Sequence, residues 1–272
     1  MKTDLKTNIK AIIARSYVRV VAANREPSWW FTETLLPILA TAAYVYVYKA
    51  LNAPEEYTGF VILGGTMSAY WIHVLWSMAA QFYWEKEIGN LELYMIAPIS
   101  RMSILLGMAS GGMFLATTRA VFIFLVGSLI FKVNFAIISL PKLFSVFVLT
   151  LVSLYGLGML FSSLFMLYGR EAWHGVTLLQ EPVHLLSGFF FPVKNLGFAV
   201  ALGASLIPMT LGLDAMRQLA FKAGPKSGFI NVNVELAGLA FLCVFFLVIS
   251  KYALEFMERI GKKEGRLTLR WQ

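Results

Sequence analysis

The chain has 272 residues, of which 58% are hydrophobic and only 14% are charged. A soluble domain carries about 25% charged residues, so this composition excludes an ordinary soluble protein and favours an all-α polytopic membrane protein. The net charge of +8 is better explained by basic residues that flank membrane spans than by a nucleic-acid partner.

Residues 1–28 are predicted to form a cytoplasmic interfacial helix. Apolar residues recur at helical spacing from Leu5 to Val21, while most of the lysines and arginines fall on the other faces. A basic amphipathic helix of this kind lies in the surface of an anionic membrane. A solvated helix of a small soluble head is the alternative, but the first predicted span follows almost at once.

Residues 29–257 are predicted to form a transmembrane domain with six crossings, followed by a basic cytoplasmic tail over 258–272. The region 192–233 is broken by Pro192, Pro208 and Pro225, so we expect short re-entrant helices near the outer surface there. The approximate ranges of the six crossings are 29–49, 58–82, 102–131, 143–168, 173–191 and 234–256.

The distribution of basic residues predicts the orientation of the chain. With six crossings, fourteen lysines and arginines lie on the side of the two termini and seven lie on the opposite side. Because basic residues accumulate on the cytoplasmic side, both termini are predicted to be cytoplasmic in a multi-pass protein of the cell membrane.

The segment 84–98 is a charged, amphipathic stretch between the second and third predicted spans. A short helix along the membrane would place its apolar residues against the spans and its carboxylates toward the cytosol. Gly89 would allow a close approach or a bend, and Pro98 would end the helix. A plain polar loop is the alternative. The carboxylates are Glu85, Glu87 and Glu92, and the apolar residues are Ile88, Leu91, Leu93 and Met95.

Three ionisable residues within the predicted spans are candidates for a functional role. Arg119 lies in the middle of the third span, where an arginine costs at least about 2.5–3.5 kcal/mol and should face protein or water. Glu181 and His184 lie in the fifth span. The three residues line a substrate pathway, or Arg119 and Glu181 form an ion pair that fixes helix register. The spacing of Glu181 and His184 also occurs in metal sites, but these need more carboxylates, so no metal is expected.

Three motifs in this order resemble segments of type-2 ABC exporter permeases. The 84–98 segment, with Glu85, Lys86, Glu87, Gly89, Leu91, Glu92 and Pro98, resembles their E-x-E-x-G-T-L-E-x-L-x-x-x-P segment. Residues 186–196, which include Phe189, Phe190, Phe191 and Pro192, resemble their S-G-x-x-F-P-x-x-x-L segment. Pro208, Thr210 and Arg217 resemble their P-x-T-x-x-x-x-x-x-R segment. The chain departs from the pattern at Asn90, where the family commonly has Thr, and at Gly197, where Pro is frequent.

The resemblance covers nearly the whole chain and implies a permease subunit rather than an enzyme. Permeases of this family pair as homodimers or with a related permease, and they dock two P-loop ATPase subunits that bind ATP and Mg. The 84–98 segment would be the coupling helix that contacts the ATPase. The residues after the fifth span would be re-entrant helices of an outer lid, and Phe189–Phe191 either an outer gate or an aromatic belt.

The lack of a nucleotide-binding loop in the sequence agrees with this interpretation. The pattern G-x-x-x-x-G-K-[ST] does not occur, so we expect ATP to be bound by a separate chain and no cofactor to be bound by this one. The E-x-E-x-G-x-L-E pattern of residues 85–92 resembles the drug-resistance branch of the family more than its polysaccharide branch. The scarcity of charge in the spans also suits a hydrophobic or amphipathic cargo, such as a drug-like molecule or a lipid, and export of a polysaccharide or glycolipid is the alternative.

Two other classes of function fit the sequence less well. An ion-coupled secondary transporter or channel would show an internal repeat and broken central helices, and neither is visible. An intramembrane enzyme would need several polar groups at one depth, and only Glu181 and His184 are visible.

Overall fold

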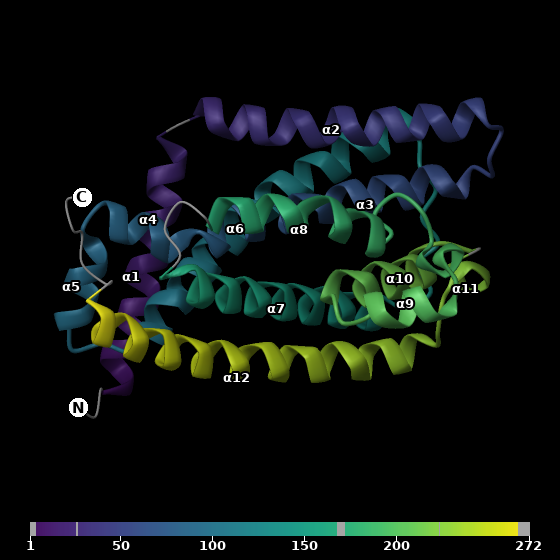
Figure 1. The fold of residues 1–272 in the computed structure, drawn as a ribbon. Helices are drawn as coiled ribbons and strands as arrows, with labels where there is room; N and C mark the ends of the chain where they lie inside the picture. The colour runs from purple at the N-terminus through teal and green to yellow at the C-terminus, as the bar shows by residue number, and fades with distance from the viewer. Residues whose placement is uncertain (1–3, 26, 168–171, 223, 266–272) are drawn as a thin grey trace.

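Long helices run lengthwise through the molecule (Figure 1). The structure, a computed structural model, describes residues 4–25, 27–167, 172–222 and 224–265. The long helices are α2 (Pro27–Ala50), α3 (Glu56–His73), α6 (Arg101–Phe131), α7 (Leu140–Phe165) and α12 (Val232–Glu264). Their apolar composition makes a helical bundle the expected arrangement in a membrane, because a helix satisfies its own backbone hydrogen bonds.

Four segments of the described chain are long and apolar enough to cross a membrane. They are the continuous stretch Glu56–Glu87 and the helices α6, α7 and α12. Helix α2 and the 15-residue α8 (Ala172–Leu186) are not among them. The predicted number of six crossings therefore stays a prediction, and residues 168–171 before α8 lie outside the described residues.

The second predicted span has no break where the 84–98 segment begins. Helix α3 continues through a π-helix, η1 (Val74–Ala79), into α4 (Gln81–Glu87). Most of this stretch is enclosed by other helices, and nearly every residue from Thr58 to Trp71 is buried. The 84–98 segment is thus connected directly to the central helix of the bundle.

Short helices fill one end of the bundle, where the sequence predicts re-entrant structure. They are η2 (Val193–Leu196), α9 (Phe198–Ala204), α10 (Pro208–Ala220) and α11 (Gly224–Ser227). Helices α9 and α10 meet at an angle of 114°, and every residue of α10 is buried. Their entry into the membrane stays a prediction.

The opposite end of the bundle carries α1 (Leu5–Asn24), α4, α5 (Asn90–Ile96) and the C-terminal end of α12 (Figure 1). Helix α1 crosses α6 at Gly107 and Gly111, where a Cβ atom would lie only 2.8 Å from the Ile12 carbonyl oxygen and 2.9 Å from that of Ser16. Small residues let two helix backbones approach this closely. The outer face of α1 exposes Leu5, Ile9, Ile13 and Tyr17, as the predicted interfacial helix requires.

Candidate coupling site at one end of the bundle

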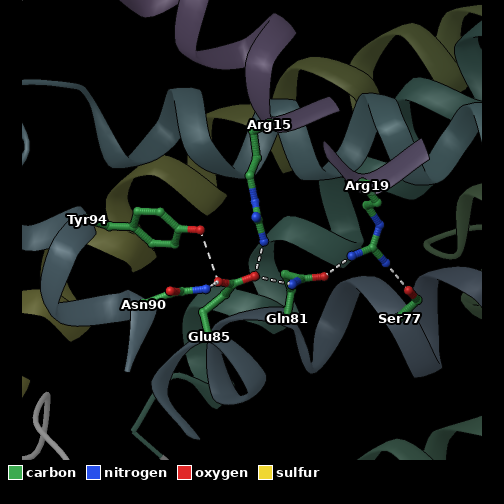
Figure 2. A network of polar contacts seen from close by, with 7 residues as sticks. All are labelled: Arg15, Arg19, Ser77, Gln81, Glu85, Asn90 and Tyr94. Atoms are coloured by element: carbon green, nitrogen blue, oxygen red, sulfur yellow. Dashed lines mark hydrogen bonds and ion pairs between the residues drawn. The ribbon is translucent and has the colours of Figure 1, made fainter. Parts of the chain in front are cut away.

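Glu85 in α4 is the centre of a polar network (Figure 2). Its side chain is only 3% exposed, and its Oε1 accepts hydrogen bonds from Arg15 and, at 2.8 Å, from Gln81 Nε2. Its Oε2 accepts from Asn90 Nδ2 and from the Tyr94 hydroxyl, each at 3.0 Å. A buried carboxylate needs this number of donors, because an unpaired buried charge is strongly destabilising.

The arginines of α1 connect this network to the π-helix. Arg15 pairs with Glu85, and Arg19 donates one hydrogen bond to Gln81 Oε1 and another to the Ser77 hydroxyl in η1 (Figure 2). Side chains from α1, η1, α4 and α5 therefore form one polar unit. Since π-helical turns occur often at functional sites, the contact of Arg19 with η1 marks this end of the bundle as a candidate functional site.

Burial shifts the pKa values of two members of the network without changing their protonation near neutral pH. Burial, assisted by the charge of Arg15, lowers the pKa of Arg19 to about 10, so the guanidinium remains charged. Burial also raises the pKa of the Tyr94 hydroxyl, which keeps its proton for the hydrogen bond to Glu85.

The arrangement of the 84–98 segment differs from the sequence-based expectation in two ways. The segment forms two helices, α4 and α5, joined at Gly89, whose φ of 78° is a left-handed conformation that glycine adopts without strain. Gly89 makes a bend and no close approach, since a Cβ there would meet nothing within 4 Å. Helix α5 ends at Ile96, before Pro98, as predicted.

The second difference concerns which side chains face outward. Glu85 points inward, whereas Ile88, Leu93 and Ile96 are exposed by 65%, 58% and 81%. The expectation holds for Leu91, which is buried, and for Glu87 and Glu92, which are exposed. Pro98 is also exposed, and Lys86 is half-buried. The outer surface of α4 and α5 therefore combines apolar side chains with carboxylates, a mixture that suits contact with another protein.

Arg119 forms an ion pair with Glu33 of α2, and the alternative prediction of a pair with Glu181 is wrong. Glu181 is exposed on α8 and accepts a hydrogen bond from Gln180 at 3.2 Å. His184 packs against the ring of Phe189, with 4.7 Å between the ring centroids. The described residues contain no group of three or more side chains that could hold a metal ion. A role of these residues in a substrate pathway stays a prediction.

Arg217 is buried and caps the irregular backbone after α8. It donates to the carbonyl oxygens of Phe189 at 2.7 Å and of Phe191 at 2.9 Å, and the Tyr48 hydroxyl donates to that of Phe190 at 3.1 Å. Phe189 is fully buried, and Phe190 stacks on Tyr44, while a role of Phe189–Phe191 as an outer gate or an aromatic belt stays a prediction. Pro192 is buried beside them, and Pro208 is the first residue of α10.

Comparison with known proteins identifies the family to which the chain belongs. The described chain is a helical bundle with four segments that are long and apolar enough to cross a membrane, and the family described as ABC-2 type transporter matches residues 7–221. The chain belongs to this family. It is 32% identical over 112 residues to the protein named probable multidrug ABC transporter permease YbhR of Escherichia coli, from strain K12 and from O157:H7. The match covers 41% of this chain and only 30% of the length of those relatives. No solved structure matches.

Sequence reasoning located the 84–98 segment but missed its partners. The helical pattern places Arg15 and Arg19 only on a basic face of the N-terminal helix, and it gives no reason to single out Glu33. The sequence does not reveal these contacts, because the residues that form each of them lie far apart along the chain. One signal points to them: the Gly107 to Gly111 spacing predicts that some helix packs closely on α6.

Proposed function

We propose that the chain is the transmembrane permease subunit of an ATP-driven exporter and that α4 and α5 form its coupling segment. The observation that carries this proposal is that a carboxylate of the segment is buried while several of its apolar side chains are exposed. The buried Glu85 fixes the segment to the bundle. The exposed side chains of Ile88, Leu93 and Ile96 need a surface that covers them. In this proposal that surface belongs to a separate P-loop ATPase, two copies of which serve a pair of permeases.

Movement of the ATPase would reach the membrane through the continuous helix. Helix α4 leads directly into η1 and α3, so a displacement of α4 acts on a helix that is enclosed by the rest of the bundle. The network of Glu85 and Arg15 would make α1 move with it. Alternating access of a pathway at the axis of the permease pair is the expected result.

The proposed cargo is hydrophobic or amphipathic and leaves the cytoplasm. Support comes from the low charge of the predicted spans and from the name of the relative, probable multidrug ABC transporter permease YbhR. The outward direction rests on the resemblance to exporters. Efflux of several hydrophobic fluorescent dyes from cells that express the chain with its ATPase would test both points.

Charged substitutions in the exposed apolar surface of α4 and α5 test whether this surface binds the ATPase. We expect the double substitution Ile88→Asp and Leu93→Asp to weaken binding of the ATPase about thirtyfold, since central apolar contacts carry most of the binding energy. The chain is co-expressed with a candidate P-loop ATPase subunit of an ABC transporter, and co-purification of the ATPase and its ATP hydrolysis are measured.

The matched control is Ile137→Asp and Ile138→Asp, two exposed apolar residues in the segment between α6 and α7. The control should bind the ATPase as the unchanged chain does. Equal binding by both double variants would show that α4 and α5 are not the docking surface. Retained ATPase binding without dye efflux in the unchanged chain would instead refute the proposed cargo.

A further inference from the structure

A pocket of about 640 Å³ lies at the end of the bundle opposite α1. Its wall is made by the C-terminal end of α2, the start of α3, the segment that follows α6, and the residues after α10. The segment after α6 is held in place by hydrogen bonds from Ala136 N to Ala220 O, at 2.8 Å, and from Ile138 N to Leu219 O, at 2.9 Å. The volume of the pocket falls within the range of small-molecule sites, about 300–1,000 Å³.

Both signs of charge line this pocket. Lys49, Lys132 and Lys222 come from three different elements, and Glu55 and Glu56 stand at the start of α3. Among the described residues, none of these five side chains has an oppositely charged partner within 4 Å. Charged groups of both signs that share a pocket without pairing leave room for a ligand between them.

Two of the lysines have defined local structure: aromatic rings contact the side chain of one, and the other ends a helix. The ammonium of Lys49 lies 5.1 Å from the centre of the Phe131 ring and 6.0 Å from that of Tyr46. Lys132 ends α6 with a φ of 52°, a left-handed conformation that is uncommon for lysine. Aromatic contacts therefore keep the ammonium of Lys49 near the pocket, and the end of α6 places Lys132 in the pocket wall.

The surroundings of the pocket are apolar on the bundle side. Tyr46 on α2 and Leu129 and Ile130 on α6 are exposed by 62%, 76% and 63%, within about one turn of the lysines. An acyl chain could lie along this surface while a headgroup occupies the pocket. Free phosphate would use only the lysines and would leave the apolar surface uncovered.

We propose that this pocket binds the headgroup of a zwitterionic phospholipid with a primary amine, that is, phosphatidylethanolamine. Lys49, Lys132 and Lys222 bind the phosphate, and Glu55 and Glu56 accept hydrogen bonds from the ammonium group. A trimethylammonium headgroup has no N–H to donate, and a purely anionic headgroup meets the two carboxylates without compensation. The inference goes beyond the proposed function and does not depend on it, because binding belongs to the purified chain alone.

The test is a lipid titration of the full chain in detergent, followed by native mass spectrometry. The probes are phosphatidylethanolamine, phosphatidylcholine, phosphatidylglycerol and inorganic phosphate. We expect phosphatidylethanolamine to bind most tightly. The variant with Lys132→Asn and Lys222→Gln should bind it roughly ten- to thirtyfold more weakly, since each lysine near a lipid surface adds a similar electrostatic contribution. Asparagine is chosen at position 132 because it tolerates the left-handed conformation.

The matched control is Lys142→Gln with Lys226→Gln, which removes the same charge from this part of the chain and leaves the pocket lining intact. A second variant, Glu55→Gln with Glu56→Gln, should lose the preference for phosphatidylethanolamine and bind phosphatidylglycerol more tightly. Equal lipid binding by the lysine variant and the control would overturn the proposal. So would inorganic phosphate that displaces the lipid completely, because this result would assign the pocket to free phosphate.

Discussion

Glu85 shows how a charged residue in the 84–98 segment can be a structural anchor. All of its partners are donors, and two of them, Asn90 and Tyr94, belong to the helix beyond the Gly89 bend. Position 90, where the family commonly has Thr, requires a donor, and both the Asn amide and a Thr hydroxyl supply one. The departure from the family pattern at Asn90 therefore preserves the contact.

Arg217 satisfies backbone carbonyl groups at the other end of the bundle. The backbone of residues 189–191 is not helical, and its carbonyl oxygens would be unsatisfied in an apolar surrounding. Arg217 and Tyr48 donate to all three of them. The residues of the predicted outer gate form a capped turn packed against α3 at Gly64, and their role as a gate stays a prediction.

The ion pair of Arg119 and Glu33 leads to a double-mutant prediction. We expect Arg119→Met and Glu33→Leu each to lower the free energy of unfolding by roughly 1–3 kcal/mol, because each leaves a partly buried charge without a partner. The combined variant should be more stable than the sum of the two losses implies. Thermal unfolding in detergent measures the coupling.

The control for this cycle is Glu181→Leu, which removes the carboxylate that the sequence suggested as the partner. Its effect should add to that of Arg119→Met without coupling, since Glu181 is exposed on α8. A coupling energy larger for Glu181 than for Glu33 would contradict the observed pair.

At the scale of elements, the packing of α1 on α6 determines whether the coupling site forms. The two serines at this crossing, Ser16 and Ser110, have hydroxyl oxygens 2.7 Å apart. Gly107 and Gly111 leave no space for a side chain between the helices. Because Arg15 and Arg19 project from the same helix, a displaced α1 would also leave Glu85 without its charged partner.

We therefore predict that Gly111→Leu separates α1 from α6 while the protein remains inserted. Overpacking of this kind costs about 1–3 kcal/mol. The measurement is disulfide formation between Ser16→Cys and Ser110→Cys in a Cys243→Ala background, whose yield should fall severalfold. Gly203→Leu is the control, since a Cβ atom at Gly203 would meet nothing within 4 Å, and it should leave the yield unchanged.

The sequence predicts the positions of the helices better than the side-chain contacts between them. The length of the apolar stretches predicted the long helices, and the charged segment that ends at Pro98 predicted helical structure where α4 and α5 lie. Both features can be read from neighbouring residues in the sequence. The direction of Glu85 could not be predicted, since it depends on Arg15, which lies 70 residues away in the chain. The same holds for Arg119, whose partner Glu33 belongs to the first predicted span.

At the scale of the whole molecule, the two ends of the bundle have different chemistry. One end gathers α1, α4, α5 and the end of α12, and it is tied together by the ion pairs of Glu85 with Arg15 and of Glu258 with Arg101, the latter at 2.9 Å. The other end holds the short helices and the lysine-lined pocket. In the proposed function, an ATPase that binds the first end would therefore move the helices as a connected group, and α3 would transmit the displacement through the core.

This polarity predicts which positions share a side of the membrane. Single cysteines at Lys6, Glu92 and Lys263 in a Cys243→Ala background should react with an impermeant maleimide only in inverted vesicles, since all three are exposed at the end with α1. Cysteines at Leu51 and Asn134, exposed at the opposite end, should react in intact cells. The excess of basic residues at the first end is the physical reason for this orientation. Labelling of positions 92 and 134 from the same side would refute it, and with it the route by which a cytoplasmic ATPase could reach α4 and α5.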